Sequence, residues 1–293
     1  MERHEIEAFL TLAEELSFRR ATDRLGLAQG RVTQIIQKLE RRFGVPLFER
    51  TSRRVALTPA GETLRDELLP AYEQVRRAVA NAVAVGRGTA VPLQVGYSSP
   101  MAADLILRAA DRFTERYGGG VQIHEVQLAD PFGPIRTGQV QLQVTELPVR
   151  EDDLVVGTVL FTEERLVMLH RDHPLAHQES VELEELADST LVVFAGDTPR
   201  YWRELHYPRH TPSGRPIAHV EAAYWQEALS MVGAGKGVTF ACARAELYYA
   251  RPDTVWLPFH GAPPIDYGII WPRHGATPRV KAFIDILETY RAG

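Results

Sequence analysis

The chain has 293 residues, which is too long for one small domain and suits two or three compact units. Hydrophobic residues make up 45% and charged residues 24%, as in an ordinary soluble globular protein. No apolar run approaches the roughly 18 residues that cross a bilayer, and the first residues lead into an amphipathic stretch rather than a secretory signal. The single cysteine, Cys242, excludes an intrachain disulfide and agrees with a cytoplasmic location.

The net charge of −5 is unevenly distributed along the chain. Residues 17–60 carry ten Lys and Arg residues against Asp23, Glu40 and Glu49, a net charge of +7, whereas residues 61–293 carry a net charge of −8. A basic block on an acidic protein indicates a surface that binds a polyanion. A solvated cluster of charges is the alternative interpretation.

The periodicity of the first residues predicts three helices. Apolar residues recur at helical spacing over 6–16, and Ser17 can cap a second helix over 18–25 that Gly26 ends. A third helix is predicted over 28–43, with an inner face formed by Val32, Ile36, Leu39 and Phe43. Two helices joined by a short glycine-containing turn are typical of a helix-turn-helix motif.

The outer face of the third helix carries residues that suit DNA. Gln and Arg present donors and acceptors that match base edges in the major groove, while Thr and Lys suit phosphates. Gly30 would let the backbone approach a duplex closely, although a glycine tolerated in a first turn is an equal alternative. The predicted DNA-contacting residues up to this point are Ser17, Arg19, Arg20, Gln29, Gly30, Arg31, Thr33, Gln34, Gln37 and Lys38.

Two short apolar runs flank a basic tip after Gly44 and predict a hairpin. Such a wing would lie beside the third helix, so that Arg50, Arg53 and Arg54 reach phosphates.

These residues resemble the DNA-binding domain of LysR-type transcriptional regulators. The matching pieces follow one another without a gap and are Ala13–Phe18, Ala21–Leu25, Lys38–Glu40, Leu47–Arg50 and Leu57–Gly61. The resemblance implies an all-α winged helix-turn-helix over residues 1–58 that binds double-stranded promoter DNA. Contact with RNA polymerase is left open.

The start of the recognition helix departs from the family pattern. The family usually has Ser-Gln-Pro where this chain has Ala28-Gln29-Gly30, and the loss of a serine cap typically costs about 1 kcal/mol. Thr33 and Gln34 also replace the usual Ser and Arg. The operator sequence of better-known members therefore cannot be carried over.

A long linker helix is predicted over 59–88, capped by Thr58 and begun by Pro59. Pro70 is expected to kink it or open it locally. Apolar residues at alternating spacings of four and three form a coiled-coil seam, namely Leu64, Leu68, Ala71, Val75, Ala78, Ala82 and Val85. The resemblance implies dimerisation here, as a homodimer or homotetramer, and a helix packed on its own chain is the alternative.

Residues 89–293 alternate between strand-like and helix-like stretches, which predicts an α/β domain with largely parallel sheets. Strands are expected near 92–97, 121–127, 140–145, 165–170, 190–195, 216–220, 237–242 and 265–271, and helices near 100–116, 130–138, 183–187, 198–206, 224–233 and 278–290. The resemblance implies two lobes like those of periplasmic binding proteins, with a small-molecule effector between them. Lobe one would comprise about 89–160 and 265–293, and lobe two about 161–264.

An effector cleft is expected at the carboxyl ends of the strands. Ser99 and Pro100 begin a helix whose free amides suit an anion, although an ordinary cap would look the same. The acids Glu146 and Asp197 would oppose an anionic effector or select a cationic or hydroxylated one, and both also suit plain loops. The predicted effector-binding residues are Ser98, Ser99, Met101, Thr145, Glu146, Phe194, Ala195, Gly196, Asp197 and Trp225.

Other motifs give way to structural interpretations. His170, His173 and His177 have a spacing that suggests a metal, but Pro174 breaks the helix that would align them. Residues 233–237 lack the order of a phosphate-binding loop. We therefore predict no catalytic residue, metal or cofactor, and a regulator whose effector changes the angle between its lobes. An enzyme fused to a helix-turn-helix and an architectural DNA-binding protein without a ligand remain as alternatives.

Overall fold

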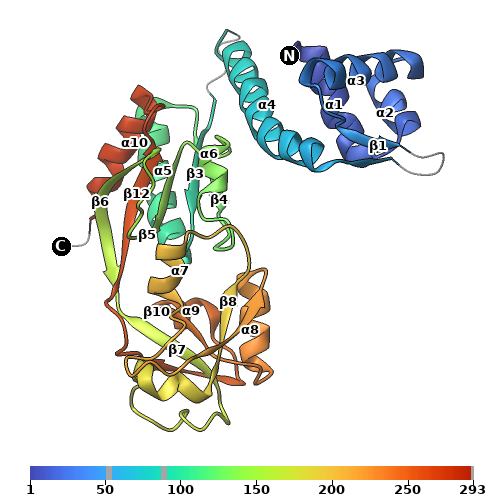
Figure 1. Ribbon diagram of the computed structural model, residues 1–293. Coiled ribbons are helices and arrows are strands. Elements are labelled where there is room, and N and C mark those ends of the chain that lie inside the picture. Colours follow the sequence, from blue (N-terminus) through green and yellow to red (C-terminus); the bar gives the residue numbers. More distant parts are fainter. Residues whose placement is uncertain (51–54, 87–90, 292–293) are drawn as a thin grey trace. The chain divides into compact units, whose positions relative to one another are not determined.

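The computed structural model describes residues 1–50, 55–86 and 91–291, which fall into two compact units, Met1–Gly86 and Arg87–Gly293 (Figure 1). Within those described ranges no helix is both long and apolar enough to cross a membrane.

The first unit is a small helical domain with a hairpin. It contains α1 (Arg3–Glu15), α2 (Phe18–Leu25), α3 (Gln29–Phe43), β1 (Phe48–Arg50), β2 (Val55–Leu57) and α4 (Pro59–Gly86). Ser17 caps α2 through its hydroxyl, which accepts from the Arg20 amide at 3.4 Å, and Gly26 ends this helix in the left-handed conformation. Left-handed backbone is open to glycine without a steric penalty, so these local signals set the boundaries of α2.

The core of this unit joins the three short helices and the hairpin. Its fully buried side chains include Phe9, Leu12, Val32, Ile36 and Leu39. The predicted inner face of α3 is wrong at its last position, because Phe43 is 40% exposed and Ile35 is buried instead. Phe43 is the last residue of α3, and its ring lies against the Arg42 guanidinium, 5.3 Å from ring centre to Cζ, rather than in the core.

Helix α4 continues unbroken through Pro70 to Gly86. Its first half packs on its own unit, because Leu64 and Leu68 contact the core and Tyr72 is buried with its hydroxyl on Glu7 Oε1 at 2.5 Å. Leu64 and Leu68 of the predicted seam thus also pack on the core of their own unit, and the seam stays a prediction. Beyond Tyr72 the helix exposes an apolar surface that includes Val75, Val79 and Val83.

Lobe one of the second unit is built on a five-stranded sheet with the order β4-β3-β5-β12-β6. Its elements are β3 (Leu93–Tyr97), α5 (Pro100–Tyr117), β4 (Val121–Glu125), α6 (Gly133–Arg136), β5 (Leu142–Glu146), β6 (Leu154–Glu163), β12 (Ile265–Pro272) and α10 (Pro278–Glu288). Helices α5 and α10 lie side by side on the sheet (Figure 1), where Phe113 meets Phe283 edge to face at 5.3 Å. Because β3 and β5 are parallel neighbours, their carboxyl ends meet at one edge of the sheet.

Lobe two contains an antiparallel sheet, β10-β7-β11, and a parallel pair, β8-β9, linked by a bridge between Leu191 and Val238. Its elements are β7 (Arg165–His170), the 3-10 turn η1 (Leu183–Asp188), β8 (Thr190–Phe194), α7 (Arg200–His206), β9 (Ala218–Ala222), α8 (Trp225–Gly233), β10 (Thr239–Cys242), α9 (Ala245–Tyr249) and β11 (Thr254–Pro258). Trp202 of α7 is 2% exposed and is one of the largest side chains in its core.

The expectation of largely parallel sheets is wrong, because both lobes mix the two directions. Strands β12 and β6 pair antiparallel in lobe one, and β7 pairs antiparallel with both of its neighbours in lobe two. Strands β6 and β11 and helix α9 were not expected from the sequence.

Two segments carry the chain between the lobes. The end of β6 and the start of β12 lie antiparallel, with Thr162 opposite Asp266, and the Thr162 hydroxyl donates to Asp266 Oδ1 at 2.6 Å. The crossings therefore form one two-stranded hinge.

Gly61 gives a test of packing in the first unit. A Cβ at this position would lie 2.1 Å from the Leu47 carbonyl oxygen, whereas a Cβ on Gly30 would meet nothing within 4 Å. Gly61→Ala should destabilise the first unit by about 3 kcal/mol through overpacking, while Gly30→Ala should stabilise it by up to about 1 kcal/mol. Calorimetric unfolding of the full chain measures both, and equal effects would contradict the packing described for Gly61.

Candidate DNA-binding surface and effector cavity

The outer face of α3 presents the residues predicted to contact DNA. Gln29, Arg31, Gln34 and Gln37 are exposed, and Thr33 is half-buried. Val32, Ile36 and Leu39 on the opposite side hold the helix to the core. Ala28 precedes the helix without a side-chain cap, as its methyl group requires.

Glu5 of α1 anchors α3 through ion pairs with two of its residues. Glu5 is fully buried, and its carboxylate pairs with Lys38 Nζ at 3.0 Å and with Arg42 Nη2 at 3.1 Å. The Glu5 carboxyl has its pKa lowered to about 2 by the hydrogen bond from the Glu2 amide and by Lys38 and Arg42. Lys38, a predicted DNA contact, is therefore already engaged by a carboxylate.

Several other cations of this unit are also paired. Arg20 Nε lies 3.0 Å from Glu15 Oε2, and Arg24 pairs with both Glu14 and Glu15. Arg19 and Arg31 are exposed and form no ion pair with any residue that the structure describes. The count of +7 in the sequence therefore exceeds the positive charge that is free for phosphates.

The hairpin is fixed to α3 through Glu40. Its Oε1 accepts from the amides of Leu47 at 3.0 Å and Phe48 at 3.2 Å, just before and at the start of β1. The predicted contacts Arg53 and Arg54 lie outside the described residues, as does the side chain of Arg50.

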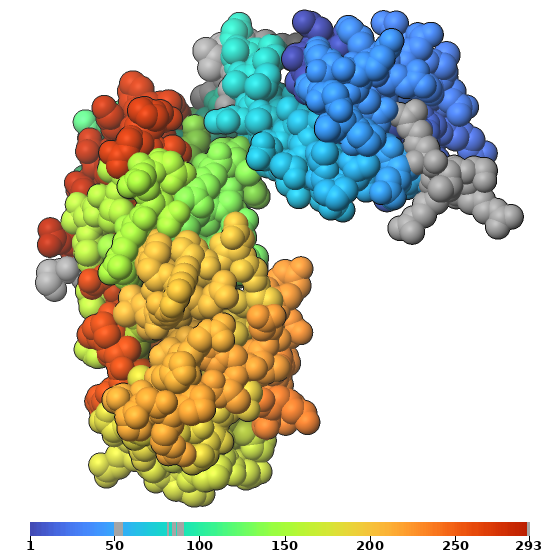
Figure 2. Space-filling model, viewed as in Figure 1, coloured from blue at the N-terminus to red at the C-terminus, as the bar shows by residue number. Residues whose placement is uncertain are grey.

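A narrow cavity lies between the lobes of the second unit, with a free volume of about 50 Å³. It is lined from lobe one by β4, β12 and the ends of β3 and β5, and from lobe two by β7, α7, α8, β10 and α9. On the face shown in Figure 2, the two lobes meet directly. This volume holds a few water molecules or a very small ligand.

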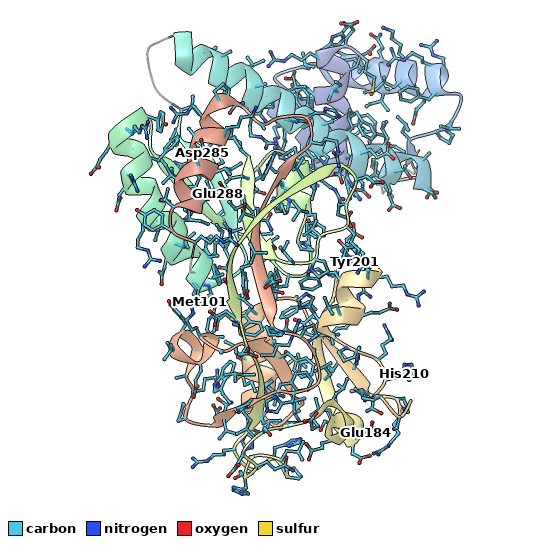
Figure 3. All side chains as sticks on the ribbon, turned by 90° about the vertical axis from the view of Figure 1, so that its left-hand side faces the viewer. Met101, Glu184, Tyr201, His210, Asp285 and Glu288 are labelled. Atoms are coloured by element: carbon cyan, nitrogen blue, oxygen red, sulfur yellow. The ribbon has the colours of Figure 1, made fainter. Side chains whose placement is uncertain are left out.

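Two further sets of hydrogen bonds join the lobes outside the cavity wall. The Tyr201 hydroxyl, on α7 (Figure 3), donates to Glu151 Oε1 at 3.0 Å and accepts from the Arg150 amide at 2.9 Å. The Tyr248 hydroxyl donates to Asp104 Oδ2 at 2.5 Å.

The lobe-one wall of the cavity combines a helix start with two serines. Ser99 Oγ accepts from the Ala102 amide at 3.3 Å and caps α5, with Pro100 in its first turn. The neighbouring Ser98 Oγ is buried and has no hydrogen-bond partner in the described structure.

A buried polar cluster forms the junction of the two lobes in this cavity. Glu146 Oε1 accepts from the Tyr267 hydroxyl at 3.2 Å, and its Oε2 lies 3.5 Å from His206 Nδ1. The same Nδ1 lies 3.4 Å from both Nη1 and Nη2 of Arg165. Arg165 Nε donates to the Pro263 carbonyl oxygen at 2.7 Å.

Burial dominates the protonation of this cluster. It raises the pKa of the Glu146 carboxyl to about 7, although Arg165 and Tyr267 oppose the rise. Burial and the Arg165 charge lower the pKa of His206 to about 3. Burial also raises the pKa of Cys242, on the same wall, to about 11, which favours the protonated thiol at neutral pH.

The predicted effector-binding residues divide into two groups. Ser98, Ser99, Glu146 and Trp225 line the cavity. The others lie off its wall: Met101 (Figure 3), Thr145, Phe194, Ala195, Gly196 and Asp197. Met101 turns into the core of lobe one, and Gly196 packs so closely on lobe one that a Cβ would lie 2.2 Å from the Ala129 carbonyl oxygen.

The sequence interpretation missed Arg165, His206, Tyr207, Tyr267 and Cys242 as lining residues. One signal was present: Arg165 opens the otherwise apolar strand β7 and is 4% exposed, and a buried cation points to a specific partner. The sequence around His206 gives no comparable signal, because only the packing of α7 brings this residue to the cavity.

Two of the three histidines accept hydrogen bonds from backbone amides close by in the sequence. His170 Nδ1 accepts from the Asp172 amide at 3.2 Å and His173 Nδ1 from the Leu175 amide at 3.2 Å. No group of three or more potential metal ligands was found among the described residues.

Known proteins share both units. Residues 4–62 match the family described as "Bacterial regulatory helix-turn-helix protein, lysR family", and residues 86–292 match "LysR substrate binding domain". The HTH-type transcriptional regulator ShiR of Corynebacterium glutamicum (strain R) is 30% identical over 303 residues, which cover 98% of both chains. AlsR of Bacillus subtilis (strain 168) is 24% identical over 294 residues, 98% of this chain and 95% of AlsR. The crystal structure of CbnR, a LysR family transcriptional regulator, superimposes with a TM-score of 0.72 at 21% identity over 100% of both chains.

A winged helix-turn-helix followed by a long helix and a two-lobed α/β domain defines a DNA-binding transcriptional regulator with an effector-binding domain. The chain belongs to the LysR family.

Glu5 provides a test of how α3 is positioned. Because its folded pKa lies below the free value, its stabilisation is present above about pH 4.5 and is lost as the pH falls towards 2. Glu5→Gln should lower the unfolding free energy by about 1–2 kcal/mol at neutral pH, and the difference from the natural chain should shrink as the pH falls through 2. Chemical denaturation across this range measures it. The exposed Glu67→Gln should change stability by less than about 0.5 kcal/mol, and an equal loss there would argue against the Glu5 anchor.

Proposed function

We propose that this LysR-family regulator binds promoter DNA as a homo-oligomer and that a small-molecule effector in the interlobe cavity changes its activity. The observation that carries the DNA-binding half is the exposed face of α3, where three glutamines and Arg31 stand away from a well-packed core. Amide side chains offer a donor and an acceptor together, which matches an adenine edge, and arginine matches guanine. The residues predicted to contact phosphates would then position this face.

The exposed second half of α4 supports oligomerisation. Val75 and Val79 are 57% and 58% exposed, and they border an apolar groove between α4 and α1 that also includes Ile6, Leu68 and Tyr72. A helix with an uncovered apolar stripe is stabilised by a second such helix. A dimer would also present two reading heads to a two-fold operator.

The hinge supports a mechanism for the effector. Both lobes contribute to the cavity wall, so a ligand that contacts both favours one interlobe arrangement over others. We infer that this shift changes how the paired reading heads are spaced on DNA. Footprints that are identical with and without the true effector would contradict this mechanism.

We infer a regulatory rather than an enzymatic role, without a cofactor, for a protein that works on DNA in the cytoplasm. The cavity's serines and thiol are not activated as nucleophiles in the described structure. Ser99 caps α5, and no base contacts the Ser98 hydroxyl. Cys242 has a raised pKa, and the His206 nitrogen nearest to a carboxylate faces Arg165. Steady product formation in a turnover screen would overturn this inference.

Gln29 and Arg53 separate base reading from phosphate binding. Gln29→Ala should change the preferred operator sequence and leave the salt dependence of binding unchanged, because an amide releases no counterion. Arg53→Ala should weaken binding to all sequences and reduce the slope of log affinity against log salt by about 1. Binding-site selection followed by salt titration measures both. An unchanged base preference in Gln29→Ala would show that α3 is docked differently.

Val79 tests the oligomer. Val79→Glu places a charge in the exposed apolar stripe of α4 and should yield monomers that bind operator DNA at least about tenfold more weakly, a loss of about 1.4 kcal/mol. Gln74→Glu, off the stripe on the same helix, should leave the oligomer intact. Light scattering gives the mass of each variant, and an unchanged mass for Val79→Glu would place the oligomer interface elsewhere.

A further inference from the structure

The cavity wall carries buried polar atoms that lack partners. Within the described structure, Ser98 Oγ, Trp225 Nε1 and His206 Nε2 are buried without a hydrogen bond, and all three residues line the cavity. An indole nitrogen is only a donor, and a hydroxyl can donate. His206 Nδ1 faces two donating groups of Arg165 and is therefore the acceptor, which leaves the proton on Nε2. Each of these atoms offers a hydrogen.

The Arg165 guanidinium adds a positive charge that is only partly satisfied. It is buried, its Nε is used by the Pro263 carbonyl oxygen, and both of its terminal nitrogens share one imidazole nitrogen. It forms no ion pair with any carboxylate in the described part of the chain. A buried cation without an anion at pairing distance is costly, and an anionic ligand would relieve that cost.

The position of Glu146 indicates a proton on its carboxyl group. Its Oε2 points at His206 Nδ1, whose lone pair already accepts from Arg165, so an ionised oxygen would face a lone pair. Protonation of the carboxyl group removes the charge that would otherwise oppose this lone pair. The groups around Glu146 are Tyr267 of β12, Arg165 of β7, His206 and Tyr207 at the end of α7, and Cys242 of β10. Burial raises the pKa of Glu146 to about 7, which agrees with this geometry.

We propose that the effector is a small carboxylate anion and that its binding is coupled to proton uptake by Glu146. This proposal rests on the proposed function of the cavity and names its ligand class. With Glu146 protonated, the wall offers donors and one uncompensated positive charge. When Glu146 is ionised, its negative charge repels the anionic ligand. It also compensates the positive charge of Arg165, so that the ligand is no longer needed for this purpose. The proton comes from solvent and stays on Glu146 while the anion is bound.

The same contacts would join the lobes. Ser98 and Glu146 belong to lobe one, whereas Arg165, His206 and Trp225 belong to lobe two. An anion held by donors from both sides therefore stabilises this closed arrangement. The free volume of about 50 Å³ favours acids of a few heavy atoms unless the lobes separate.

The test is calorimetric titration of the full-length chain with formate, acetate and benzoate between about pH 5.5 and 8.5, with acetamide as the uncharged match for acetate. We expect a carboxylate to bind with constant affinity well below pH 7 and to weaken up to about tenfold per pH unit above it. Repeating the titration in buffers of different ionisation enthalpy should show proton uptake that rises through pH 7. Acetamide should bind at least about tenfold more weakly than acetate.

Variants separate the roles of the two charged groups. Glu146→Gln, a permanent neutral donor, should keep low-pH affinity and lose the pH dependence. Arg165→Gln should lose carboxylate binding, and Ser98→Ala, which removes one donor from the wall, should weaken it severalfold at every pH. Glu125→Gln, an exposed acid at the cavity rim, should retain the pH dependence. Thermal unfolding of each variant confirms that it folds.

Three results would overturn the proposal. If the Glu146→Gln chain kept the natural pH dependence, Glu146 would not be the proton acceptor. If acetamide bound as tightly as acetate, the negative charge of the ligand would not contribute to binding. If no carboxylate binds but an uncharged or cationic metabolite stabilises the chain, the ligand class is wrong while the effector role stands. If no compound in a broad metabolite panel shifts the unfolding temperature or the DNA footprint, the effector role itself fails.

Discussion

Burial of the Arg165 guanidinium beside the hinge is the interaction on which the effector cavity depends. Arg165 begins β7 just after the chain leaves lobe one, and its Nε holds the carbonyl of Pro263 just before the chain returns. Its charge influences the protonation of Glu146, His206 and Tyr207, because the surrounding low dielectric screens it weakly. Arg165 thus joins the two crossing segments and contacts His206 of α7, which in turn lies against the Glu146 carboxyl group at the end of β5.

The DNA-binding unit uses its charges differently. Glu5 engages Lys38 and Arg42, and Glu14 and Glu15 engage Arg20 and Arg24, so several cations serve to orient helices rather than to attract phosphate. The exposed pairs of Glu14 and Glu15 contribute little stability each, whereas the carboxylate of Glu5 is buried, and both sets of pairs restrict side-chain geometry near the DNA-reading face. The uncharged amides of α3 are consequently prominent on that face, which suits hydrogen bonding to base edges.

The sequence did not predict strand β6, and it did not show which surface covers the apolar face of α4. In both cases the answer depends on elements that are distant in the sequence. The residues of β6 are buried in no regular alternation, because this strand lies at the edge of one sheet and then runs into the hinge, so no period of two appears. The seam in α4 looked uniform over seven positions, yet Leu64 and Leu68 pack on the unit's own core while Val75 is exposed. Periodicity shows which side of a helix is apolar, but not what covers it.

The sequence by itself determined the elements whose signals are local. Ser17 and Gly26 bound α2, Thr58 and Pro59 begin α4, and Ser99 and Pro100 begin α5, since caps and glycines act over one turn of chain. Only the tertiary structure decided the cavity. Tyr267 reaches Glu146 across 121 positions of sequence, and Arg165 reaches Pro263 across 98 and His206 across 41. Contacts of such separation depend on how the sheets stack and where the chain crosses, and no short stretch of residues encodes that arrangement.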